Sequence, residues 1–119
     1  MPKTPESTYE PAYDAQKIAD HLIGRVHSHL SDCTILYLTT TDETIVKGRI
    51  AMAKTTLMTP LQRYLDSGKA SDQDGARVAI VIDRAIWQRL TLTQRTALID
   101  HELMHIVATD DSETDWKLR

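Results

Sequence analysis

Residues 77–105, RVAIVIDRAIWQRLTLTQRTALIDHELMH, decide the fold. The stretch begins with residues 77–82, a run of Val, Ile and Ala with the length and β propensity of a buried strand. Asp83 follows as a helix cap, and the apolar residues up to Leu90 are spaced as in a short helix. This order predicts a strand that leads directly into helical structure.

The second half of the stretch carries the signals of a longer helix. The sequence TLTQ at residues 91–94 matches a capping box, in which two side chains bond to each other's backbone N–H groups at a helix start. Helical periodicity predicts that this helix begins at Leu92 and ends near Ala108, where Thr, Asp and Ser residues terminate it. The last five residues of the stretch, HELMH, therefore belong to the helix.

Further elements are predicted upstream of residue 77 from periodicity and turn residues. The predicted elements are a helix over residues 11–30, strands over residues 34–38 and 44–54, a short helix over residues 59–68 and a loop over residues 67–75. The strand over residues 44–54 has a basic, exposed face that suits the edge of a sheet. The element order, with its N-terminal helix, predicts an α+β fold with a small sheet.

Length and composition limit the class of protein to which the sequence can belong. A chain of 119 residues is the size of one domain, which we place at residues 11–119 after a mobile N-terminal arm at residues 1–10. A formal net charge of -3 disfavours a nucleic-acid partner, and no apolar run has the length of a signal peptide or a membrane span. Cys33 is the only cysteine, so we expect a buried side chain and a cytoplasmic protein.

The motif HELMH has the residue types and spacing of a catalytic zinc site. On a helix, His101 and His105 project from one face one turn apart, and imidazole nitrogen is a good zinc ligand. Glu102 lies beside such an ion rather than on it, where its carboxylate can act as a general base on the zinc-activated water. The motif predicts Zn²⁺ as the cofactor and hydrolysis, above all of a peptide bond, as the reaction.

A catalytic zinc needs a third protein ligand, and acidic residues follow the motif. The sequence HELMHIVATDD parallels the metzincin pattern H-E-x-x-H-x-x-G-x-x-[HD], with Asp111 in the position of the third ligand. Ala108 replaces the glycine of that pattern, and alanine resists the positive φ of a sharp turn. Asp111 is therefore the candidate. The alternatives with the same chemistry are Asp110, Glu113 and Asp115.

Several other residues have a structural interpretation. His21, His27 and His29 are expected at the boundary of the first helix rather than at a metal, with His29 nearest the apolar side. Asp100 precedes the motif and could orient an imidazole, but it has a different helical azimuth from His105.

The sequence resembles the putative phage metallopeptidases, domains of phages and prophages built around HExxH. The resemblance lies in residues 47–54, in the block 78–105 and in the tail 110–119. It implies a zincin-like fold with the HExxH helix packed on a mixed sheet, His101 and His105 as zinc ligands and Glu102 as catalytic acid/base. It also implies a peptide or protein substrate and, for a phage-encoded protein, the host cytoplasm as location.

Two other functions remain open on the sequence alone. A non-catalytic phage-encoded binding protein could retain the motif as a vestigial or structural metal site, and a hydrolase could act on a non-peptide amide or ester. For the peptidase, an edge strand such as residues 46–53 could hold an extended substrate by β-augmentation. The third ligand could come from Asp111, from one of its neighbours or from another molecule.

Overall fold

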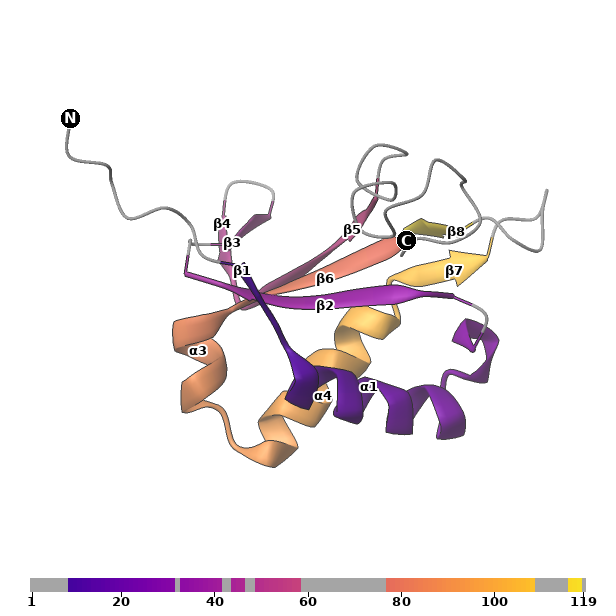
Figure 1. Ribbon diagram of the computed structural model, residues 1–119, viewed down its shortest axis with the longest axis horizontal. Helices are drawn as coiled ribbons and strands as arrows, with labels where there is room; N and C mark the ends of the chain where they lie inside the picture. The colour runs from indigo at the N-terminus through magenta and orange to yellow at the C-terminus, as the bar shows by residue number, and fades with distance from the viewer. Residues whose placement is uncertain are drawn as a thin grey trace.

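The computed structural model describes residues 9–31, 33–41, 44–46, 49–58, 77–108 and 116–118 (Figure 1). Its elements in chain order are β1 (Tyr9–Pro11), α1 (Tyr13–Arg25), the 3-10 helix η1 (Ser28–Leu30), β2 (Ile35–Thr40), β3 (Thr44–Val46), β4 (Arg49–Ala51), β5 (Ala53–Leu57), β6 (Val78–Asp83), α3 (Arg84–Arg89), α4 (Leu92–Leu103), β7 (Ile106–Ala108) and β8 (Trp116–Leu118). The predicted helix over residues 59–68 and the loop over residues 67–75 lie outside the described residues. Within the described part, no helix is long and apolar enough to cross a membrane.

Four strands form the main sheet in the order β1-β2-β6-β5. β2 and β6 are parallel, with Ile35 opposite Val78, whereas β1 pairs antiparallel with β2 and β5 antiparallel with β6. Tyr9 and Glu10, at the end of the predicted arm, lie in β1. The predicted α+β class is confirmed, and its sheet is mixed. Two separate hairpins, β3-β4 and β7-β8, complete the described strands.

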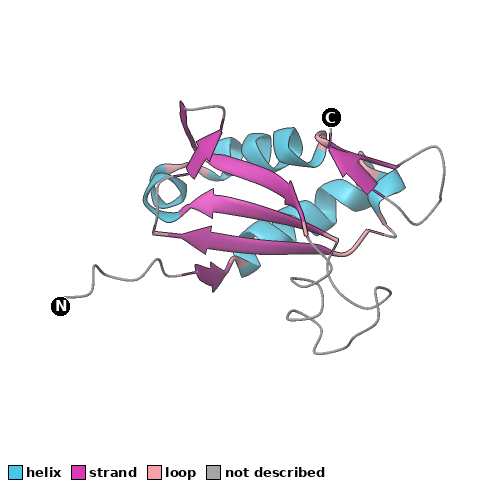
Figure 2. Ribbon diagram, turned by 90° about the horizontal axis from the view of Figure 1, so that it is seen from above, coloured by secondary structure: helices cyan, strands magenta, loops and turns pink. Residues whose placement is uncertain are grey.

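Helices α1 and α4 lie on the same face of the sheet (Figure 1, Figure 2). Val78, Ile80 and Ile82, alternate residues of β6, are completely buried, as the period of a strand requires. They share one hydrophobic core with Ile99 and Leu103 of α4, which are also completely buried. Burying one side chain of this size contributes about 1.5–3 kcal/mol. This core fixes the helix that carries HELMH against the centre of the sheet.

The first helix is shorter than predicted. It ends at Arg25, and the 3-10 helix η1 replaces the predicted last turns before Leu30. The backbone N–H groups of Val26 and His27 both donate to the carbonyl of Leu22, at 2.7 and 3.0 Å, so the regular helical ladder stops there. The change of direction buries His27, which a continuous helix would have left at its flank.

The predicted strand over residues 44–54 is divided into three. β3 and β4 pair with each other as a hairpin, and β5 joins the main sheet beside β6 after a bend at Met52. The Met52 carbonyl accepts a hydrogen bond of 2.9 Å from the N–H of Asp83 at the end of β6. The alternation of apolar and polar residues continues unchanged through such a bend, so the sequence pattern could not reveal that the predicted strand is divided at Met52.

A cluster of three side chains joins the helices to one another. The carboxylate of Asp14 on α1 accepts a hydrogen bond of 2.8 Å from the indole N–H of Trp87 on α3, and Trp87 is buried. Arg95 on α4 lies over the Trp87 ring, 4.8 Å from its centroid, and its Nη1 is 3.4 Å from Asp14. Each of α1, α3 and α4 therefore contributes one member, and the buried indole N–H has a partner.

Replacing Asp14 tests this cluster. Asp14→Ala leaves the buried indole N–H without its acceptor, so we expect the free energy of unfolding to fall by about 1–3 kcal/mol. Urea denaturation measures the change. Gln16→Ala, at an exposed position of the same helix, is the matched control and should change stability by less than about 0.5 kcal/mol. Because alanine has the highest helix propensity, neither change should lose stability through the helix itself, and equal losses in the two variants would contradict a specific role of the indole hydrogen bond.

Candidate metal centre

The helix that carries the motif begins where the capping box predicts. The Thr91 hydroxyl accepts from the Gln94 N–H at 3.2 Å, and the Gln94 side chain accepts from the Thr91 N–H at 2.9 Å. This reciprocal pair satisfies two of the N–H groups that a helix start leaves without partners. The predicted start of α4 is confirmed, and its first residue is Leu92.

The predicted end of this helix is wrong. α4 ends at Leu103 instead of near Ala108, and residues 106–108 form strand β7. β7 pairs antiparallel with β8, and Ile106 is completely buried. The β-branched side chains of Ile106 and Val107 favour an extended backbone, and the pairing with β8 overrides the helical period of the sequence.

The motif nevertheless continues after Leu103 in a hydrogen-bonded turn formed by Met104 and His105. The N–H of Met104 donates to the Asp100 carbonyl and the N–H of His105 donates to the Glu102 carbonyl, each at 3.2 Å. His105 thus lies in a tight turn that continues the path of the helix. As a result, His105 stays about one turn above His101 although the regular α-helix has already ended at Leu103.

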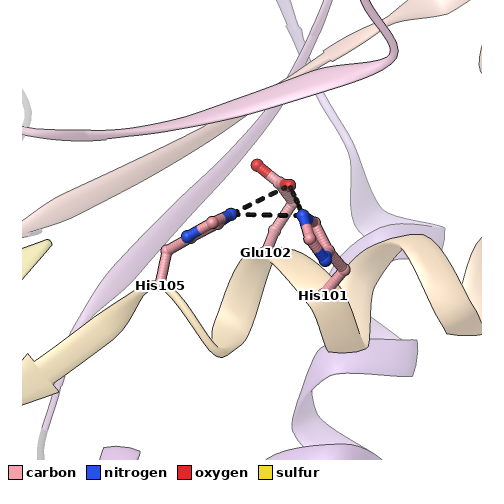
Figure 3. Close-up of side chains that lie close together, drawn as sticks. All are labelled: His101, Glu102 and His105. Atoms are coloured by element: carbon pink, nitrogen blue, oxygen red, sulfur yellow. Dashed lines mark hydrogen bonds and ion pairs between the residues drawn. The ribbon is translucent and has the colours of Figure 1, made fainter. Parts of the chain in front are cut away.

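The side chains of the motif converge at this turn (Figure 3). The Nε2 atoms of His101 and His105 are 3.3 Å apart, and the two rings are nearly perpendicular at 89°. Oε2 of Glu102 lies 4.0 Å from each of these nitrogens. Among the described residues, these three form the group whose potential ligand atoms all lie within 4.8 Å of one another.

The spacing of the two imidazole nitrogens suits a shared zinc ion. Zn–N bonds of about 2.0–2.1 Å at tetrahedral angles separate two nitrogens by about 3.3–3.4 Å. The observed separation is 3.3 Å. The Nε2 lone pair of each ring is available to a metal ion when the ring carries its proton on Nδ1. One neutral ring can also donate to the other at this distance, so metal binding would replace that hydrogen bond.

Glu102 differs from the histidines in its burial. Its side chain is 6% exposed, whereas those of His101 and His105 are 66% and 39% exposed. Oε1 accepts a hydrogen bond of 3.0 Å from the Thr55 hydroxyl on β5. Within the described residues, no lysine or arginine forms an ion pair with this carboxylate. A buried carboxylate needs hydrogen bonds or a cation, and a cation held by the two imidazoles would supply the missing charge.

Sequence reasoning did not identify Thr55. The predicted strand ended at Lys54, and no motif connects Thr55 to Glu102. The continued β-branched run Thr55-Thr56 was a signal that the strand is longer, but the contact with Glu102 depends on how β5 packs above α4.

The histidines of the N-terminal half do not join this group. His27 is buried, and its Nε2 lies 2.6 Å from Oδ1 of Asp100. His21 and His29 are exposed, so the expectation that His29 lies nearest the apolar side was wrong. Asp100 contacts an imidazole, as the sequence allowed, but this imidazole belongs to His27 and not to the motif. This pair ties the segment after α1 to the residue that precedes His101.

The candidates for a third ligand lie outside the described residues. These candidates are Asp110, Asp111, Glu113 and Asp115. The strands on either side are described: Ala108 at the end of β7 is opposite Trp116 at the start of β8. Ala108 therefore belongs to a strand and does not form the turn that the glycine of the metzincin pattern provides.

Cys33 is not part of the centre. It is buried, as predicted, and burial raises the pKa of its thiol to about 12, which keeps it protonated and unreactive at neutral pH.

Comparison with known proteins gives one family. No curated protein and no solved structure matched the chain. The family described as Putative phage metallopeptidase matches residues 7–119, which is nearly the whole chain. Membership implies a metal ion and a peptide or protein substrate, and the His-Glu-His group is the part of the described structure with ligands for a metal. The chain belongs to the putative phage metallopeptidase family.

Proposed function

We propose that this protein is a zinc-dependent peptidase with a zincin-like fold, acting on peptides or proteins in the host cytoplasm. The observation that carries the proposal is the convergence of two imidazole nitrogens, 3.3 Å apart, beside a buried carboxylate. Two nitrogen ligands and an adjacent acid are among the groups that metal-assisted hydrolysis requires, together with a third ligand. Family membership supports the same reaction class.

His101 and His105 hold the metal in this proposal, and Glu102 is the general base. Bound zinc would supply a Lewis acid that lowers the pKa of a water molecule and polarises the scissile carbonyl. Oε2 of Glu102 faces the imidazoles and accepts the proton of the attacking water, while Oε1 remains bonded to Thr55. Glu102 then returns the proton to the leaving amine, as a base and acid in turn.

A strand edge with which an extended substrate could pair lies beside the centre. The predicted edge at residues 46–53 corresponds mainly to the hairpin β3-β4, and the edge of the main sheet is β5. Among the described strands, β5 pairs with β6 on one side only. Thr55 in the middle of β5 contacts Glu102. An extended peptide added to this edge would pass the carboxylate and the two histidines, with main-chain hydrogen bonds holding it.

We propose Asp111 as the third ligand. It supplies an oxygen donor of the type that completes zinc sites, and it has the metzincin spacing from His105. Residues 109–115 connect the paired ends of β7 and β8, and β7 follows His105 directly. The proposal therefore rests on ligand chemistry and spacing, and metal titration tests it.

The role of Glu102 is tested with Glu102→Gln. The amide cannot accept a proton, so we expect kcat on casein or a peptide library to fall by about 10²–10⁴-fold. Zinc content, measured by atomic emission, should stay at one ion per chain because both histidines remain. The matched control is Glu10→Gln, in β1 at the opposite edge of the sheet, which should retain activity. Sub-stoichiometric zinc and no cleavage by the wild type would favour the non-catalytic binding protein instead.

The role of Thr55 as a positioning residue is tested with Thr55→Val. Loss of one hydrogen bond to Glu102, worth about 0.5–1.5 kcal/mol, should lower kcat about 3–10-fold with little change in KM or zinc content. Thr55→Ser keeps the hydroxyl and should recover most of the loss. Thr56→Val is the control on the same strand, because the Thr56 hydroxyl contacts the backbone of Leu57 and not Glu102. A serine variant as impaired as the valine variant would contradict the role of the hydroxyl.

The third ligand is tested with Asp111→Ala. Zinc affinity, measured by competition with a chromophoric chelator, should fall by more than the roughly 10–100-fold typical of an outer-shell partner. Asp20→Ala, an exposed position on α1, is the matched control. Unchanged affinity would remove Asp111 from the centre, and Asp110, Glu113 and Asp115 would then be replaced in the same way.

A further inference from the structure

A pocket of about 500 Å³ opens beside the candidate centre. Its lining residues are Met52, Leu90, Gln94, Ala97, Leu98 and His101. His101 belongs both to this pocket and to the His-Glu-His group. The pocket therefore adjoins the proposed catalytic site, and its volume lies within the range of about 300–1,000 Å³ that is typical of sites for small ligands.

One face of α4 forms most of the pocket. Gln94, Ala97, Leu98 and His101 are spaced i, i+3, i+4 and i+7, which places them in one stripe along the helix. Ile99 and Leu103 on another side of α4 are completely buried in the core. The small side chain of Ala97 leaves space in the middle of the stripe. One side of the helix thus packs the fold, and another side lines the pocket.

Met52 forms the other side of the pocket. It lies at the bend immediately before β5, and its apolar side chain is 47% exposed. Its carbonyl accepts a hydrogen bond from the Asp83 N–H at the end of β6, which fixes the position of the bend. Side chains of an extended peptide alternate between its two faces. A peptide paired with β5 would therefore direct alternate side chains toward α4, where the pocket lies.

We propose that this pocket binds a large apolar side chain of the substrate, of the Leu, Met or Phe class, in a residue next to the scissile bond. The inference rests on the proposed peptidase function. The lining is apolar except for the Gln94 amide and the His101 imidazole, and none of its residues is a lysine, arginine, aspartate or glutamate. A charged side chain would lose hydration there without gaining a charged partner, whereas an apolar one gains by burial.

The kinetic test uses peptides that differ in one residue. On the zinc-loaded wild type, kcat/KM is measured for a series that carries Leu, Phe, Ala or Asp beside the cleaved bond. We expect the Leu and Phe peptides to exceed the Ala and Asp peptides by at least about ten-fold, since even one methylene in an apolar pocket is worth about 10–200-fold.

Two variants alter the pocket and one serves as control. Ala97→Leu fills the space on α4 and should lower the ratio of Leu-peptide to Ala-peptide kcat/KM at least about ten-fold. Met52→Lys places a charge at the exposed rim and should raise the relative rate of the Asp peptide. Ala85→Leu makes the same alanine-to-leucine change at an exposed position of α3 outside the pocket, and it should leave the ratio as in the wild type.

A binding measurement keeps this inference separate from the proposed reaction. N-acetyl-L-leucinamide and the α-amide of N-acetyl-L-aspartic acid, whose side-chain carboxylate is charged, are titrated into the protein, and the ¹³C-methyl resonance of Met52 is followed by NMR. A saturable shift that occurs with the leucine compound only, and that is lost in Ala97→Leu, supports the apolar pocket even if no peptide is cleaved. Absence of cleavage would then count against the peptidase function and not against the pocket. Cleavage without apolar preference, or without any effect of Ala97→Leu on the ratio, would overturn the pocket's role and leave the peptidase standing. Neither cleavage nor a shift would overturn both.

Discussion

The buried carboxylate of Glu102 is the group around which the candidate centre is built. A carboxylate out of contact with water is costly unless donors or a cation surround it. Here one oxygen is held by the Thr55 hydroxyl, and the other faces two imidazoles at 4.0 Å. This arrangement requires that β5 lies directly above the end of α4. The position of the edge strand and the chemistry of the centre are therefore set by the same contact.

The end of α4 is held in place from two further directions. Ile99 and Leu103 bury one side of the helix in the core with β6, and Asp100 forms a short contact with the buried imidazole of His27. Residues before and within the motif are thus fixed while His101 stays largely exposed. If His101 holds a metal as proposed, the ion would be open to a substrate without a large rearrangement of the fold.

The same geometry explains how binding and chemistry could be combined in a small domain. The edge of β5 offers main-chain hydrogen bonds, the pocket between Met52 and Ala97 offers apolar surface, and His101 is common to the pocket and the metal group. Main-chain pairing holds any extended peptide, so side-chain selection has to come from a pocket. In the proposed peptidase, few residues would therefore be needed to position a peptide bond beside Glu102.

The sequence by itself determined those features that depend on neighbouring residues. The capping box of Thr91 and Gln94, the buried strand that precedes it and the one-turn spacing of His101 and His105 are local patterns, and each has its counterpart in the structure. Most of the catalytic hypothesis came from these patterns. Tertiary structure decided that α4 stops at Leu103, since the pairing of β7 with β8, added to the β propensity of Ile106 and Val107, outweighs helical periodicity. It likewise decided the contacts of Thr55 with Glu102 and of His27 with Asp100, because residues distant in sequence meet only once helices and strands have packed.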